Sequence, residues 1–235
     1  HTRTIADPRY GAKLTGKVGD TTLGLLVAND EGPGRIDDPT AAGFGQTAQV
    51  VVGRARYDLY SESYVGAIFT DREFLDGYSR VAGGDGRFRL SPTSSVSFQY
   101  AESQHRDGTG TEQSGPTYHL ALDSNSRNLS YQVSIDSVDP AFRTDTGFVQ
   151  RVDTRTAQAN AMYRWWPQNW LINWGPSGGY RLNFNYDGIR VDEVVEGEVD
   201  FAFAHNISAD VGVSQALERF GGINFDKTTY TASVR

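Results

Sequence analysis

The sequence predicts an all-β protein built from antiparallel strands, and three observations support this fold class. Apolar and polar residues alternate along most of the chain, which is typical of strands because successive side chains point to opposite faces. Clusters of glycine, aspartate, asparagine, proline and serine separate the alternating stretches, as turns do. The connections are too short for crossover helices, so consecutive strands are expected to pair in an up-and-down order.

Six stretches alternate most clearly, and each has one apolar side. In chain order, these apolar sides run from Val51 to Leu59, Ala82 to Leu90, Val96 to Tyr100, Leu129 to Ile135, Tyr180 to Tyr186 and Val195 to Phe203. Weaker alternation predicts strands near residues 10–18, 21–29, 63–71, 117–123, 154–166, 170–175, 207–214 and 227–235. The total is about fourteen strands. The longest turn-rich connections are Asp30–Gln46 and Ser103–Pro116.

Composition excludes several classes of protein. The 235 residues include no cysteine, which rules out disulfides and thiolate metal sites. A net charge of −7 argues against a nucleic acid partner, which would require a clustered basic surface. No stretch approaches the ~20 consecutive apolar residues of a membrane-spanning helix. The four histidines have no metal-ligand spacing, so no metal and no cofactor are expected; they are His1, His105, His119 and His205.

Alternation alone fits both a soluble β-sandwich and a transmembrane β-barrel, and further features favour the barrel. Many stretches alternate for about nine residues, close to the ~9–11 that cross a bilayer. Small residues such as Gly53, Ala55 and Gly84 are frequent on the apolar sides and would fill a soluble core poorly. Tyrosine is the only ionisable residue there, whereas a basic residue facing lipid costs ~2–4 kcal/mol. We therefore expect one barrel domain, or a barrel segment, over residues 1–235.

Aromatic residues gather near the ends of the expected strands. The headgroup level of a bilayer suits an apolar ring with a polar tip, which makes these residues candidate interface anchors. They are Tyr57, Tyr100, Trp165, Trp166, Trp170, Trp174, Tyr180 and Tyr186. Stacking of the tryptophans on a sugar is a weaker alternative.

Charged residues on the opposite sides are expected to line a hydrated lumen. They are Arg54, Arg56, Asp58, Asp85, Arg87, Arg89, Glu196, Glu198 and Asp200. Both signs occur, which suits ion pairs between neighbouring strands. The three carboxylates of residues 196–200 share one side, and either Ca²⁺ binding or pairing with arginine on the next strand would satisfy them; pairing is favoured.

The segment from Phe142 to Arg151 follows Pro140 and is expected to leave the sheet. Two interpretations remain open. In the first, the segment folds inward as a constriction in which Arg143, Asp145 and Arg151 set selectivity. In the second, it is a structured turn whose Arg–Asp pair and aromatic plug, including Phe148, satisfy one another.

Four stretches of the chain resemble the DUF5916 family of outer-membrane β-barrel proteins. They are residues 10–26 with the sequences GAKLTGK and LGLL, residues 65–72, residues 84–90 and, most specifically, residues 139–151. Together they cover roughly residues 9–165. The resemblance implies an outer-membrane barrel that often carries an N-terminal carbohydrate-binding-like module of the family 9 type. It also implies that this chain is the central part of a larger barrel. It does not imply a defined activity.

These observations predict a non-enzymatic protein of the bacterial outer membrane with a pore, transport or surface-binding role. The lipid bilayer is the expected partner. Other outer-membrane or secretion components and a saccharide or polymer are further candidates, through the resemblance. A soluble lectin-like β-sandwich is the alternative, and a barrel-embedded hydrolase using His119 with Asp123 is a weaker one.

The edges of the expected sheet need partners in a membrane. An open sheet exposes unpaired backbone groups, which lipid does not tolerate. Additional strands, or pairing of residues 10–18 with residues 227–235, would remove these edges. Because the chain begins at His1 rather than at methionine, we expect a processed product or part of a longer chain.

Overall fold

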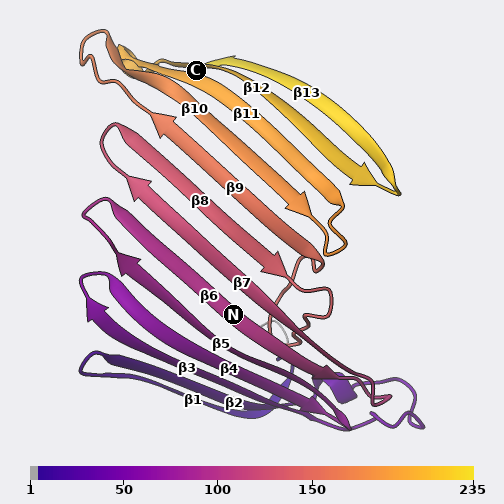
Figure 1. Cartoon of the computed structure of the whole chain (residues 1–235). Coiled ribbons are helices and arrows are strands. Elements are labelled where there is room, and N and C mark those ends of the chain that lie inside the picture. The colour runs from indigo at the N-terminus through magenta and orange to yellow at the C-terminus, as the bar shows by residue number, and fades with distance from the viewer. Residues whose placement is uncertain (1–4) are drawn as a thin grey trace. The chain divides into compact units, whose positions relative to one another are not determined.

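The computed structural model describes residues 5–235, and its elements are almost all strands (Figure 1). His1 lies outside the described residues. The strands contain 10 to 14 residues each. In order they are β1 (Pro8–Val18), β2 (Thr21–Asp30), β3 (Ala48–Tyr60), β4 (Ser63–Phe74), β5 (Gly77–Arg89), β6 (Ser94–Arg106), β7 (Glu112–Asn125), β8 (Leu129–Val138), β9 (Thr154–Tyr163), β10 (Leu171–Phe184), β11 (Arg190–Phe203), β12 (Ser208–Phe220) and β13 (Ile223–Val234). Two 3-10 turns, η1 (Gly32–Gly34) and η2 (Ala204–Asn206), complete the described elements.

The described strands form one sheet in which each strand neighbours those next to it in sequence, from β1 to β13. This confirms the predicted all-β, antiparallel, up-and-down fold. A sandwich needs two packed sheets, so the sandwich alternative is wrong for residues 5–235. Closure of the sheet into a barrel is not seen, because β1 and β13 are its edges. The same residues contain no helix that is long and apolar enough to cross a membrane.

The prediction of about fourteen strands is wrong, since the described residues form thirteen. Residues 170–175 and the stretch from Tyr180 to Tyr186 were expected as two strands, but a single strand, β10, runs from Leu171 to Phe184. The ladder between β9 and β10 ends at Ser177, opposite Met162, and one isolated pair joins Trp174 to Trp165 beyond it. Pro176 lies in between and has no N–H to donate, which explains the interruption.

Gly175 is required where β10 passes the end of β9. A Cβ at this position would lie 1.7 Å from the carbonyl oxygen of Tyr163. Gly175→Ala should therefore lower the free energy of unfolding by about 1–3 kcal/mol, because backbone must shift to admit the methyl group. Denaturant titration measures the effect. Gly197→Ala in β11 is the matched control, since the nearest atom to its added Cβ is 4.0 Å away. Equal stability of the two variants would contradict the prediction.

The two longest predicted connections differ in outcome. The connection expected over Ser103–Pro116 shortens to residues 107–111, because β6 and β7 extend into it. The connection after β2 stays long, over residues 31–47. Asp107 holds the shorter turn by accepting hydrogen bonds from the Thr109 hydroxyl at 2.6 Å and from the N–H groups of Thr109 and Thr111. These hydrogen bonds, led by the one from the Thr109 hydroxyl, lower the pKa of Asp107.

The chain divides into two compact units, each described here by itself. Unit 1 comprises residues 1–88, 98–118 and 138–153. Unit 2 comprises residues 89–97, 119–137 and 154–235. In unit 1, two-residue turns join β1 to β2 and β3 to β4 at one end, and the long connections 31–47 and 139–153 lie at the other end.

Each unit has an apolar face and a polar face, which the strand register defines. In unit 1, three rows of residues, each contributed by β1 to β5 in order, form the apolar face. They are Val18–Thr21–Tyr57–Val65–Gly86, Gly16–Leu23–Ala55–Ala67–Gly84 and Leu14–Leu25–Gly53–Phe69–Ala82. The next row on this face ends in Asp71 and Arg80, which form an ion pair at 3.1 Å. The apolar face is exposed, with Leu14 at 72% and Phe69 at 44%.

The apolar face of unit 2 carries stacked aromatic rings at one end. The Trp165 and Trp174 rings stack with centroids 4.5 Å apart, and Trp174 also stacks on Phe201 at 6.0 Å. Trp170 stacks on Phe203 at 5.8 Å. Further along β10, Tyr180 donates to Glu193 at 2.9 Å, near the opposite end of the strand. The aromatic residues therefore bracket an apolar stretch that contains Val195, Val199, Val211 and Val213.

Other predicted aromatic residues occupy less regular positions. Tyr57 is half exposed on the apolar face of unit 1, and Tyr100 donates to Glu102 at 3.3 Å from the middle of β6. Trp166 donates its indole N–H to the carbonyl of Arg127 at 3.0 Å. Tyr186, in the turn after β10, lies 4.0 Å from the Arg155 guanidinium and hydrogen-bonds to Ser137.

Candidate functional site

Arg54 on β3 and Asp85 on β5 form a bidentate ion pair on the polar face of unit 1. Arg54 Nη2 donates to Asp85 Oδ2 at 2.7 Å, and Nη1 donates to Oδ1. Gly66 on the intervening strand β4 makes room for it, because a Cβ there would lie 2.8 Å from Arg54 Nη2. Bidentate arginine–carboxylate pairs are among the stronger charge-assisted contacts. The sequence predicted both charges on this face but not the glycine that lets them meet.

A second polar cluster joins β1 and β3 on the same face. Asp58 accepts from Lys17 Nζ at 2.7 Å and from Arg56 Nε at 2.9 Å. The Arg56 guanidinium also lies 3.9 Å from the centre of the Tyr64 ring. Arg87 lies opposite Tyr64 in the register.

Arg89 ends β5 and belongs to unit 2. Its side chain donates to the carbonyls of Ser91 and Pro92, at 3.2 and 3.0 Å, in the turn after β5. These two hydrogen bonds stabilise the turn.

The acidic residues of β11 lie on the polar face of unit 2. Asp200 approaches Arg164 Nη2 at 3.5 Å, so one of the three carboxylates pairs with an arginine. Glu196 and Glu198 form no ion pair with other described residues and line a recess of about 410 Å³. No group of three or more acidic or histidine side chains among residues 5–235 has an arrangement that could hold a metal ion.

The segment between β8 and β9, residues 139–153, folds back onto the polar face of unit 1. Three backbone N–H groups attach it to the strands. Asp139 donates to the carbonyl of Pro116 at 3.0 Å. Arg143 donates to Ser103 Oγ at 3.0 Å, and Asp145 donates to Ser79 Oγ at 3.0 Å. We refer to residues 139–153 as the inner segment.

Side chains complete the attachment of the inner segment. Phe142 is 8% exposed and packs against Val81 of β5 and Ala101 of β6. The Asp145 carboxylate accepts from Arg72 Nη1 of β4 at 3.0 Å. The segment thus lies on the polar face of unit 1, where the buried Phe142 ring and the ion pair of Asp145 with Arg72, a residue outside the segment, hold it.

The remaining predicted residues of the inner segment are exposed. Phe148 is 89% exposed, and the side chains of Arg143 and Arg151 are exposed as well. Only the backbone of Arg143 contributes to the attachment. Asp145 therefore anchors the segment through its side chain, whereas Arg143 anchors it through its backbone.

Sequence reasoning missed the residues that receive the inner segment. Ser79 and Ser103 are almost completely buried, and Arg72 was noted only as part of a motif. The sequence marks these two serines only by their position on the side of β5 and β6 opposite the apolar one, and many other serines share that position.

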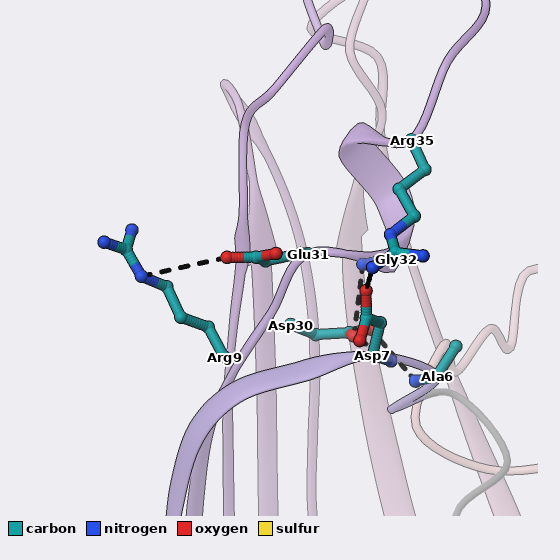
Figure 2. A network of polar contacts seen from close by, with 7 residues as sticks. All are labelled: Ala6, Asp7, Arg9, Asp30, Glu31, Gly32 and Arg35. Atoms are coloured by element: carbon teal, nitrogen blue, oxygen red, sulfur yellow. Dashed lines mark hydrogen bonds and ion pairs between the residues drawn. The ribbon is translucent and has the colours of Figure 1, made fainter.

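A polar network holds the start of β1 against the connection after β2 (Figure 2). Asp30 is 1% exposed and accepts hydrogen bonds from the N–H groups of Asp7 at 2.7 Å, Gly32 at 3.2 Å and Ala6 at 3.3 Å. An ion pair between Asp7 and Arg35 lies beside it. Both Asp30 oxygens thus serve as acceptors.

Asp30→Asn should lower the free energy of unfolding by about 1–3 kcal/mol. The amide NH₂ of asparagine would face a backbone N–H group whichever way it turned, leaving a buried donor without an acceptor. Denaturant titration measures the loss. Asp38→Asn, at an exposed position of the same connection, is the matched control. A loss for Asp38→Asn as large as that for Asp30→Asn would contradict the prediction.

The hydrolase hypothesis paired His119 with Asp123, and the structure pairs His119 differently. His119 Nδ1 lies 2.5 Å from Asp136 Oδ1 of β8. Asp123 instead accepts from Gln132 Nε2 at 2.8 Å. The predicted pair is therefore wrong, because Asp136, on the neighbouring strand, holds the ring.

Comparisons with known proteins assign no family to this chain. No family model and no curated protein matches the chain, so the resemblance to the DUF5916 family stays a prediction. Among solved structures, the crystal structure of Pseudomonas aeruginosa OccK5 (OpdH) is similar. The two share 13% sequence identity, the match covers 99% of this chain and 74% of that one, and the TM-score is 0.45. A match at this level does not bear on activity or substrate.

Proposed function

We propose that the chain is a transmembrane β-barrel, or a segment of one, in the bacterial outer membrane, and that its polar face lines a water-filled passage for solutes. One observation carries the proposal. In each unit an apolar face lies exposed along strands of 10 to 14 residues, long enough to cross a bilayer. Exposure of such an apolar face to water is unfavourable, whereas lipid chains would cover it.

The boundaries of the apolar face support the same proposal. In unit 1 the apolar rows give way to the Asp71–Arg80 ion pair, and Arg80 also contacts Glu73 at 2.6 Å. Charges near the midplane would cost several kcal/mol, but charges at the interface cost ~0–1 kcal/mol. An apolar band bordered by charges and aromatic rings is the surface pattern of outer-membrane barrels.

The polar face supports a solute passage rather than a catalytic site. Many of its charges are joined in ion pairs, and the inner segment lies on this face in unit 1, where a constriction segment of a pore would lie. We propose a non-enzymatic role in transport or surface binding. A saccharide or polymer substrate and partners in the outer membrane or in secretion come from the family resemblance alone.

Two measurements test the proposed function. The folded protein in detergent should migrate faster than the heated protein in electrophoresis, and in planar bilayers it should produce discrete ionic conductance steps. A protein that stays monomeric and soluble without detergent would contradict membrane insertion. Stable insertion without conductance would contradict the passage.

Tryptophan fluorescence tests where the membrane meets the strands. The chain has four tryptophans, all between Trp165 and Trp174, so the emission reports on this end of unit 2 alone. Lipids brominated near the headgroup should quench it more strongly than lipids brominated near the chain end, because stacked rings favour the interface. Stronger quenching by the deep bromines, or none by either lipid, would contradict this placement.

A further inference from the structure

We propose that the inner segment forms a binding site for small organic anions with an apolar body, in which Arg143 contacts the anionic group and Phe148 contacts the body. The inference rests on the proposed function, since solutes must reach the polar face of unit 1. It goes further by assigning a ligand class to two residues.

The segment encloses a recess of about 360 Å³, within the size range of small-molecule sites. Its lining mixes two kinds of side chain. Phe142, Phe148, Val149 and Val152 provide apolar surface, and Arg143 provides a cation. Gln113 and Thr144 add neutral polar groups to the lining. A recess that combines apolar surface with a few polar groups and one charge suits an amphiphilic ligand.

Arg143 has a fixed backbone and an available side chain. Its N–H group donates to Ser103 Oγ at 3.0 Å, which holds the residue at the edge of the recess. Among residues 5–235, no carboxylate forms an ion pair with its guanidinium. A guanidinium presents a rigid fork of donors that matches a carboxylate or a phosphonate.

Phe148 has little protein contact. It is 89% exposed, whereas Phe142 of the same segment is 8% exposed. An aromatic ring left in water on a polar face offers a stacking surface for an apolar ligand body. The rest of the segment does not use this ring, because the anchoring contacts belong to Phe142, Asp145 and the backbone.

The charges around the recess favour anions. Three acidic side chains on the polar face of unit 1 form ion pairs: Asp58 with Lys17 and Arg56, Asp85 with Arg54, and Asp145 with Arg72. Arg143 adds a positive charge to a surface on which these three carboxylates are compensated by cations. Such a surface raises the local concentration of anions.

Benzoate, acetate and benzyl alcohol probe the site, because acetate lacks the apolar body and benzyl alcohol lacks the charge. Equilibrium dialysis of each labelled probe against the folded full protein in detergent, with protein-free micelles as the blank, measures binding without requiring a pore. We expect benzoate to bind more tightly than either of the other two. Arg143→Gln and Phe148→Ala should each weaken benzoate binding, Arg143→Gln by about tenfold.

Lys13→Gln is the matched control, because it removes a cation from the polar face of unit 1 outside the recess. It should leave benzoate binding unchanged. If Lys13→Gln and Arg143→Gln weaken benzoate binding equally, the effect is one of overall charge and the proposed site is wrong. Equal binding of acetate and benzoate would also overturn the site. Unchanged heat-modified migration of the variants verifies folding.

The outcomes separate the two proposals. If the wild-type protein produces no conductance steps, the passage is refuted, whether or not benzoate binds to the protein in detergent. Conductance with no Arg143-dependent benzoate binding would refute the site and leave the passage intact. In bilayers, benzoate should also interrupt the current of the wild type for longer than that of Arg143→Gln, and equal interruption times would count against the site.

Discussion

Replacing Val213 by arginine should lower the free energy of unfolding of the membrane-embedded protein by about 2–4 kcal/mol. Val213 lies near the middle of β12 on the apolar face, between Gly197 of β11 and Tyr230 of β13, and is 46% exposed. If lipid covers this face, the guanidinium must enter hydrocarbon near the midplane. Urea titration of the protein in phospholipid vesicles measures the change.

The adjacent residue provides the control. Ser214 points to the polar face and lies opposite Glu196, which has no ion pair among the described residues. Ser214→Arg places the same side chain one position away, in water and beside a carboxylate, so its stability should stay close to that of the wild type. If the two variants lose equal stability, lipid does not cover one face alone, and the membrane orientation of the sheet is refuted.

Phe142→Ala should release the inner segment from the polar face of unit 1. Removing a buried phenylalanine costs about 3 kcal/mol or more, and Phe142 is the one large side chain in the cluster with Val81 and Ala101. The remaining anchors are a partly exposed ion pair and a few hydrogen bonds, each contributing about 1 kcal/mol. Single-channel conductance should increase severalfold, and trypsin should cleave after Arg143 faster than in the wild type.

Phe44→Ala is the matched control for this release, because it truncates the same kind of side chain outside the inner segment, where the ring is 47% exposed. Its conductance and its rate of tryptic cleavage should stay close to those of the wild type. A severalfold higher conductance in Phe44→Ala, or an unchanged conductance in Phe142→Ala, would mean that the buried ring of Phe142 does not hold the segment.

Periodicity predicted the strands well because it depends on a local rule. The alternation of Val51 and Leu59 with Arg54 identifies a strand with two unlike faces wherever it occurs, and the register places Arg54 on the polar face. The same rule failed at Gly175–Gly179, where glycine and proline resemble a turn. There the strand continues because its other edge pairs with β11 from Leu171 to Phe184, a nonlocal contact that composition does not encode.

The candidate site was predictable in its residues but not in its contacts. The sequence marked Phe142, Arg143 and Asp145 because they follow a proline at the end of a strand. Which of them anchors and which remains free depends on Ser79 and Ser103, distant in sequence and common in type. A hydrogen bond between a serine hydroxyl and a backbone N–H of another segment leaves no mark on periodicity, so only the structure reveals it.

The number of described strands constrains how the sheet can close. Direction reverses at every step of the up-and-down order, so after twelve reversals the last of the thirteen described strands runs the same way as the first. Joining β13 directly to β1 would create one parallel ladder in an otherwise antiparallel sheet, whereas bacterial outer-membrane barrels formed by a single chain have an even number of antiparallel strands. An antiparallel barrel containing this sheet therefore needs an odd number of further strands between β13 and β1.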